Sequence, residues 1–177
     1  MHGSQPRSSQ DERYTAAAER FAGAIERLAR GYEADPELRR DLVQEIHAQL
    51  WRSFAYFEGQ CSERSWAYRV AHNVAVSHMI ARRRLKAEAL SGLEEIAEIP
   101  GSDDVEASAA DADVTARLLA TIHRLKPADR QVMLLYLEDL TAAEIGDVTG
   151  LSAGAVATRI HRVKAVLAHK FKLEDPR

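Results

Sequence analysis

The chain has 177 residues, of which 46% are hydrophobic and 29% are charged, a composition typical of folded globular proteins rather than disordered ones. Its apolar runs are too short to cross a bilayer and none resembles a secretory signal, so we expect a cytoplasmic protein without membrane insertion. The net charge of −3 excludes a uniformly basic chain, and the single cysteine, Cys61, excludes an internal disulfide and a cysteine-built zinc site.

The first part of the chain predicts a disordered leader followed by two helices. Residues 1–12 are polar, whereas residues 13–87 are expected to form one helical domain. A first helix is predicted by apolar residues near the helical repeat, at Tyr14, Phe21, Ile25, Leu28 and Tyr32. Asp35 and Pro36 are typical of a helix start, as cap and first-turn residue. The second helix then carries apolar residues at four-residue steps, at Leu38, Leu42, Ile46, Leu50 and Phe54.

A loop with exposed aromatic residues is expected at 56–61, where Gly59 breaks the helical period. Ser62 is placed to cap a third helix, in which Trp66 shares a stripe with Val70 and Val74 and is therefore assigned to the core. Between Arg69 and Lys86 there are five basic residues and no acidic one.

Loop and helix together have the composition of a surface for single-stranded DNA, because aromatic rings stack on unpaired bases and basic groups follow the backbone. The candidate contacts are Tyr56, Phe57, Tyr68, Arg69, His72, Asn73, Arg82, Arg83 and Arg84.

An acidic linker is predicted over residues 88–112. Nine acidic residues and no lysine or arginine occur from Glu88 to Asp113, together with Gly92 and Pro100-Gly101. Such a segment repels itself and lacks a sustained period, so we expect a flexible connection.

A second helical domain is expected over residues 113–172, and its most specific feature is a helix-turn-helix. Thr141 and Glu144 can form a capping box at the start of its first helix, and Gly150 ends that helix. Ser152 then caps a second helix, whose buried stripe is predicted at Val156, Ile160, Val163 and Leu167. This second helix is the one expected to enter the major groove.

Outward positions of the second helix are the candidate contacts to duplex DNA. Thr158 and Arg159 are candidates for base edges, since arginine can donate two hydrogen bonds to guanine. Arg162 and Lys164 are expected to hold phosphates. The full set is Ser152, Ala155, Thr158, Arg159, His161, Arg162 and Lys164. An ordinary helical hairpin with a solvated basic face is the alternative. No strand-like alternation is present, so the predicted fold is all-α, with two small helical domains joined by the linker.

These segments resemble the extracytoplasmic-function group of sigma-70 RNA polymerase sigma factors, over about residues 19–171. Asp41-Leu42-Val43-Gln44-Glu45-Ile46 through Leu50-Trp51 is similar to the helix with which sigma factors bind core polymerase. Trp66 through Asn73, continuing to Arg82-Arg83-Arg84, resembles the part of sigma region 2 that melts and reads the minus-ten element. Leu125-Lys126-Pro127 through Arg162 resembles sigma region 4, which reads the minus-thirty-five element.

The resemblance implies a non-catalytic factor that binds core RNA polymerase and directs promoter-specific initiation by recognising and melting promoter DNA. Its implied partners are core RNA polymerase and promoter DNA, with no cofactor or metal, and regulation by an anti-sigma factor or a kinase is left open. The polymerase-binding residues it implies are Asp41, Leu42, Gln44, Glu45, Gln49 and Trp51. One departure is Arg39-Arg40, where the family usually has small and acidic residues.

Three other interpretations explain less of the chain. A helix-turn-helix activator with a sensor domain accounts for residues from Leu118 onward but leaves the first domain unexplained. An enzyme would need a metal-binding histidine pair, a glycine-rich phosphate loop or a nucleophile elbow, and none of these patterns is present. A scaffold that only binds helices would be expected to interleave both charge signs on its surface.

Overall fold

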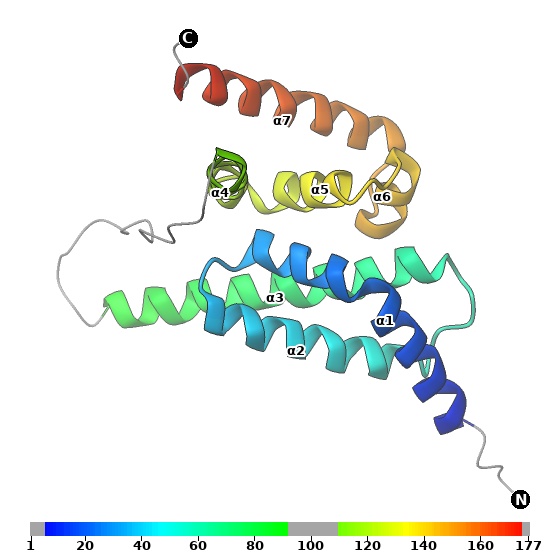
Figure 1. The fold of residues 1–177 in the computed structure, drawn as a ribbon. Helices are drawn as coiled ribbons and strands as arrows, with labels where there is room; N and C mark the ends of the chain where they lie inside the picture. Colours follow the sequence, from blue (N-terminus) through cyan, green and yellow to red (C-terminus); the bar gives the residue numbers. More distant parts are fainter. Residues whose placement is uncertain (1–5, 92–109, 175–177) are drawn as a thin grey trace, which may run out of the picture.

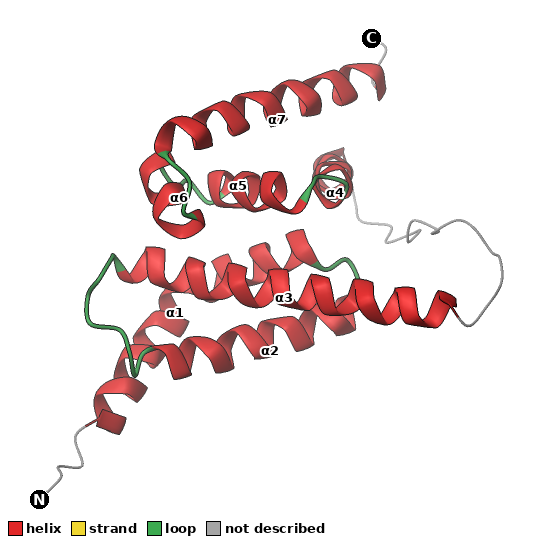
Figure 2. Cartoon of the chain, turned by 180° about the vertical axis from the view of Figure 1, so that it is seen from behind, coloured by secondary structure: helices red, strands yellow, loops and turns green. Residues whose placement is uncertain are grey.

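The computed structural model describes residues 6–91 and 110–174. Within these stretches the chain forms seven helices, which confirms the predicted all-α fold (Figure 1). They are α1 (Pro6–Tyr32), α2 (Pro36–Ser53), α3 (Glu63–Ser91), α4 (Ala110–His123), α5 (Pro127–Leu137), α6 (Ala142–Thr149) and α7 (Ala153–Glu174). Helices α1–α3 form one lobe and α4–α7 a second lobe, in which α7 lies on the side away from the first (Figure 2). None of the described helices is long and apolar enough to cross a membrane.

The first lobe is built around the apolar face of α2. The Asp35 carboxylate caps this helix by accepting hydrogen bonds from the backbone amides of Glu37 (2.9 Å) and Leu38 (3.1 Å), as its sequence predicts. Leu42, Ile46 and Leu50 then lie fully buried between α1 and α3. Burial of three such side chains contributes roughly 1.5–3 kcal/mol each.

Helix α1 begins at Pro6, so the prediction of a disordered leader to residue 12 is wrong beyond residue 5. The first turns are anchored to Trp51, at the end of α2. Gln10 Nε2 donates to the Trp51 carbonyl and Trp51 Nε1 donates to the Asp11 carboxylate, each at 2.7 Å. Residues 1–5 lie outside the described part.

The linker is shorter than predicted at both ends. Helix α3 continues through Ser91, because Ala87, Glu88, Ala89 and Leu90 all favour helix and no glycine or proline comes before Gly92. Helix α4 begins at Ala110. The remainder of the predicted acidic linker, 92–109, lies outside the described residues.

The second lobe contains the predicted helix-turn-helix in α6 and α7. Thr141 and Glu144 form the reciprocal capping box at the start of α6. Gly150 ends α6 in the left-handed conformation, with φ 77°. Ser152 Oγ accepts a hydrogen bond from the Ala155 amide at 3.2 Å and so caps α7. The inward stripe of α7 is confirmed, with Val156, Val163 and Leu167 buried and Ile160 packed against the core.

The two lobes pack directly on one another, and one continuous apolar core includes residues of both. Helices α1 and α5 approach so closely at Gly31 that a Cβ there would lie 2.3 Å from Leu134 Cδ2. Glu138, in the turn after α5, accepts two hydrogen bonds of 2.7 Å from the Arg27 guanidinium of α1. We call this contact region, formed by α1 and α3 on one side and α4–α6 on the other, the lobe junction.

Inside the first lobe, His72 is completely buried and shares a 2.8 Å hydrogen bond between its Nδ1 and the Tyr32 hydroxyl. Its Nε2 atom has no hydrogen-bond partner among the described residues. Burial lowers the pKa of His72 to about 3, because an imidazolium there would lose its hydration. His72 is therefore a neutral core residue at physiological pH.

Replacing Gly150 with Ala tests the left-handed turn. Because φ is 77° and nothing lies within 4 Å of the added Cβ, the cost is conformational and should be about 1–2 kcal/mol of unfolding free energy. Gly154→Ala is the matched control: Gly154 lies in α7 with equal free space, so alanine should be neutral or stabilise by about 0.5–1 kcal/mol. Urea unfolding measures both, and equal effects of the two substitutions would contradict the assigned turn.

The buried His72 predicts a specific pH dependence of stability. The unfolded chain takes up a proton near pH 6.5, whereas the folded chain does so only near pH 3, so stability is complete above 6.5 and falls as the pH decreases. The slope from this one group approaches about 1.4 kcal/mol per pH unit. In urea unfolding between pH 7.5 and 5, His72→Gln should flatten the dependence, while the exposed-site control His161→Gln should not. Identical slopes in all three proteins would refute the assignment.

Candidate nucleic-acid and polymerase interfaces

Helix α7, the second helix of the helix-turn-helix, presents its N-terminal half to solvent, as its sequence predicts. Its backbone there carries only small side chains, because Ala153, Gly154 and Ala155 follow the Ser152 cap. The candidate contacts that lie exposed on this helix and its cap are Ser152, Ala155, Thr158, His161, Arg162 and Lys164. Arg159 is half-buried.

Two arginines of this helix share one carboxylate from α5. Asp129 Oδ1 accepts hydrogen bonds from Arg159 Nη1 at 2.9 Å and from Arg162 Nη2 at 2.7 Å. The Asp129 side chain is 12% exposed, whereas that of Arg162 is 61% exposed. Both guanidinium groups thus stay at the surface while one acid beneath them orients both.

Lys164, two residues after Arg162, is held from α5 as well. Its Nζ lies 3.3 Å from the Tyr136 hydroxyl and 5.3 Å from the centre of the Tyr136 ring. The contact combines a hydrogen bond with a cation–π interaction. The cationic face of α7 therefore rests on α5, and the two helices position it together.

The aromatic loop of the first lobe holds two different kinds of side chain. Tyr56 is 75% exposed, and its side chain makes no hydrogen bond or ring contact with the other residues that the structure describes. Phe57 is half-buried, with its ring centre 5.9 Å from that of Phe54 and 5.2 Å from that of Trp66. The Trp66 indole packs inward and donates to Ser53 Oγ at 2.9 Å, as expected for a core residue. Tyr56 is the side chain of this loop that is free to stack on a base.

Three of the predicted contact residues lie buried in this structure. His72 is fully buried against Tyr32. Tyr68 is buried at the lobe junction, where burial together with the nearby Glu138 carboxylate raises its pKa to about 12. Leu42, predicted to contact polymerase, belongs to the α2 core. Leu42 faces inward as part of the apolar stripe of α2, whereas His72 and Tyr68 are buried because α1 and the second lobe cover further surface of α3.

The predicted single-strand contacts on α3 divide into exposed side chains and side chains bonded within the chain. Asn73, Arg83 and Arg84 are exposed. Arg69 is partly exposed and donates to the Asp147 carbonyl of α6 at 2.5 Å, so the second lobe holds its guanidinium. Arg82 forms an ion pair with Glu33 at the end of α1.

Glu33 remains an anion in this pair despite its burial. Burial alone would raise the pKa of Glu33, but hydrogen bonds from Arg82, the Asp35 amide and His78 outweigh it and hold the pKa below its usual value. The Arg82 guanidinium is therefore neutralised by its own chain before any nucleic acid binds.

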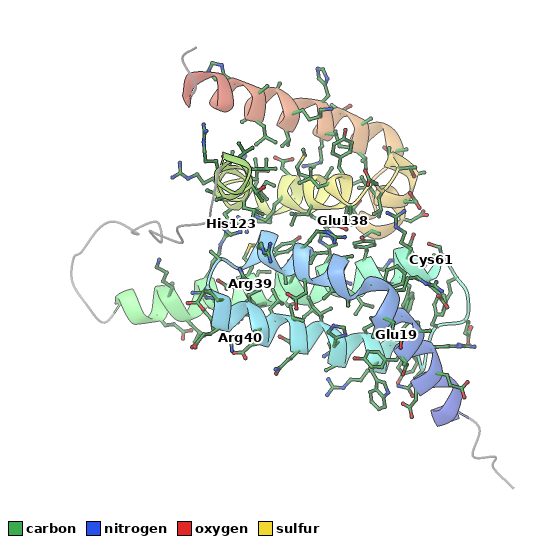
Figure 3. The ribbon with its side chains drawn as sticks, in the orientation of Figure 1. Glu19, Arg39, Arg40, Cys61, His123 and Glu138 are labelled. Carbon is green, nitrogen blue, oxygen red and sulfur yellow. The ribbon has the colours of Figure 1, made fainter. Side chains whose placement is uncertain are left out.

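The outer face of α2 is polar and lies away from the second lobe, on the side where Figure 3 labels Arg40. Asp41, Gln44 and Glu45 are exposed there, and Gln49 is half-buried. Trp51 is 39% exposed, with its indole N–H held by Asp11. The predicted polymerase-binding residues other than Leu42 thus share one accessible helix face. Among the described residues, no group of three potential ligands could hold a metal ion.

Asp129 and Glu138 are the two site residues that the sequence analysis missed. Each is an acidic residue beside a basic surface, and its arginine partners are distant in the chain. Those of Asp129 lie 30 and 33 positions away, and that of Glu138 lies 111 positions away. No local period or motif marks such pairs. The one usable signal was the isolation of Asp129 in an otherwise basic and apolar first turn of α5.

Comparison with known proteins agrees with this arrangement. The sigma-70 region 2 family profile matches residues 17–85, and the sigma-70 region 4 profile matches residues 115–167. The ECF RNA polymerase sigma factor SigE of Mycolicibacterium smegmatis is 32% identical over 143 residues, which cover 80% of this chain and 54% of that protein. The ECF RNA polymerase sigma-E factor of Haemophilus influenzae is 26% identical over 140 residues, covering 75% of this chain and 74% of its own. This chain thus spans about half the length of the first relative and three quarters of the second.

A solved structure extends the likeness to the fold. CnrH, in complex with the cytosolic domain of CnrY, superposes with a TM-score of 0.69 at 22% identity, over 97% of this chain and 95% of that one. The two matched regions occur in the order that the lobes have here, and together they account for α1–α3 and α4–α7. The chain therefore belongs to the sigma-70 family, with close similarity to its extracytoplasmic-function sigma factors.

Proposed function

We propose that this chain acts as a sigma factor that binds core RNA polymerase and directs promoter-specific transcription initiation. The observation that carries the proposal is the presence of regions 2 and 4 on one chain, each with a solvent-exposed surface suited to its ligand. The chemistry of RNA synthesis belongs to the polymerase. Regulation by an anti-sigma factor or a kinase remains a prediction from the family resemblance.

Each surface has a role in this proposal. The outer face of α2, with Asp41, Gln44 and Glu45, binds the polymerase. The exposed half of α7 enters the major groove upstream, where Arg159 reads a base edge and Arg162 holds a phosphate. Tyr56 stacks on an unpaired base of the minus-ten element, and the remaining exposed basic residues of α3, Arg83 and Arg84, follow the DNA backbone.

The packed lobes must separate for this function. Elements at minus ten and minus thirty-five are about 25 base pairs apart, or roughly 85 Å along a duplex with a rise of 3.4 Å per base pair. The longest helix here, α3 with 29 residues, is only about 44 Å long. Lobes packed side by side cannot reach both elements, and a carbonyl of the second lobe also holds the Arg69 guanidinium. The described arrangement is therefore the resting form of the free chain.

The direct test is capture of core RNA polymerase by the purified chain, followed by run-off transcription from genomic templates. Stoichiometric capture and new promoter-dependent transcripts are expected. Duplex binding without capture would instead favour the helix-turn-helix activator interpretation, and loss of the transcripts on substituting Asp41 and Gln44 would assign the polymerase face.

Replacing Tyr56 with Ala should impair promoter melting. Base–aromatic stacking contributes about 1–3 kcal/mol per base, so open-complex formation should fall roughly ten- to a hundredfold. Permanganate reactivity of unpaired thymines in the transcribing complex measures this step. Tyr56→Phe, which keeps the ring, is the matched control and should melt DNA normally. Equal melting by the alanine and phenylalanine variants would exclude stacking by this residue.

Replacing Glu138 with Gln should loosen the lobe junction. Loss of the charged hydrogen bonds from Arg27 costs the closed form about 1–2 kcal/mol, which shifts the open population roughly tenfold. Small-angle X-ray scattering should show a larger radius of gyration, and duplex binding by the free chain should strengthen. Glu19→Gln removes the same charge from an exposed position of α1, where Figure 3 shows Glu19 away from the junction, and should change neither. A Glu138 variant that behaves like the Glu19 control would show that this contact does not hold the lobes together.

A further inference from the structure

The place of Asp129 in the first turn of α5 does not by itself explain its hydrogen bonds. It is the third residue of α5, where a carboxylate is favoured by the positive end of the helix. Lys126, the capping residue of α5, makes no side-chain cap, so free amides are available nearby. The hydrogen bonds of Asp129 nevertheless go to Arg159 and Arg162 of the recognition helix, both on the same oxygen.

This geometry fixes the direction of two guanidinium groups. Arg159 and Arg162 are three residues apart and therefore lie on one face of α7. A guanidinium carries five N–H donors in a planar fork, so a bond to Asp129 through one nitrogen leaves the others free for DNA. Because Asp129 is nearly buried, its charge needs these partners, and the arginines are held there even when no DNA is bound.

We propose that Asp129 is a positioning residue for duplex recognition, which orients Arg159 and Arg162 toward defined places on the DNA and reduces their attraction to arbitrary phosphates. This inference rests on the proposed function, because it needs a sequence that α7 recognises. The Asp129 carboxylate competes with every DNA phosphate for the N–H groups of Arg159 and Arg162. A base edge at the correct place can still bind the N–H groups that Asp129 leaves free. Asp129 thus lowers non-specific binding more than specific binding.

Asp129→Asn should therefore change two quantities in opposite senses. The affinity for non-specific duplex should rise. Its logarithmic salt dependence should steepen by about one unit, because one more arginine becomes free to neutralise a DNA phosphate. Discrimination between the preferred duplex and a scrambled one should fall roughly tenfold, about the contribution of one bidentate base contact. Asp129→Glu, which keeps the charge, should restore the salt dependence.

The experiment uses the full chain with core RNA polymerase. A randomised duplex library is first enriched with the wild-type chain, and the enriched duplex and a scrambled one of equal length are then titrated at several salt concentrations with each variant. Asp139→Asn is the matched control: it removes one acid from an exposed turn of the same lobe, at φ 59°, which asparagine adopts readily. A thermal melt of each variant separates lost positioning from lost folding.

The outcomes distinguish this inference from the proposed function. Lower discrimination and a steeper salt dependence for Asp129→Asn, with Asp139→Asn unchanged and Asp129→Glu restored, support the positioning role. Equal weakening on both duplexes together with a lower melting temperature would show a merely structural residue and overturn it. An unchanged ratio and slope would also overturn it while leaving the sigma-factor assignment intact. Failure of the wild-type chain to enrich any sequence would contradict the proposed function itself, and the inference with it.

Discussion

The carboxylate of Glu138 accepts more hydrogen bonds across the lobe junction than any other side chain described, two from Arg27 and one from Tyr68. Its side chain is 9% exposed, yet it carries a charge that water can no longer stabilise. The Arg27 guanidinium from α1 and the Tyr68 hydroxyl from α3 provide the replacement, at 2.7 Å and 3.1 Å. The carbonyl of the same residue accepts a 2.5 Å bond from Arg64. Three residues of the first lobe thus converge on one residue of the turn between α5 and α6, which Figure 3 shows at the junction.

Pairing of charged side chains within the chain also explains how a protein with net charge −3 can carry DNA-binding surfaces. Several of its cations are paired internally: Arg159 and Arg162 share Asp129 and keep one net positive charge, Arg82 pairs with Glu33, and Arg27 pairs with Glu138. Carbonyls serve in the same way for others, as Asp147 does for Arg69. The free chain therefore holds these particular basic groups with its own acceptors, and DNA would have to replace the acceptors, whereas Arg83 and Arg84 stay exposed. Replacing an internal acceptor favours DNA sites that hydrogen-bond the arginine better than that acceptor does, and this difference makes binding selective.

Sequence reasoning succeeded where structure depends on neighbours in the chain. The four-residue steps of α2, the Asp35 cap, and the Thr141–Glu144 capping box are local patterns, and each is present as expected. It failed where a partner is distant. The start of α1 depends on Trp51, about forty positions away, and the burial of Tyr68 depends on Glu138, seventy positions away. Helical periodicity marks one buried face, so it could not reveal that α1 and the second lobe cover further surface of α3.

We propose that the packed lobes are a resting form that opens when polymerase binds. Cys61 is the only cysteine and lies partly exposed in the loop before α3, so a second cysteine at the exposed His169 of α7 allows one pair of spin labels across the lobes. The inter-label distance, measured by double electron–electron resonance, should show one narrow population in the free chain. Addition of core RNA polymerase and promoter DNA should replace it with a population at a longer distance. An unchanged distance in a complex shown to transcribe would exclude the opening of the lobes.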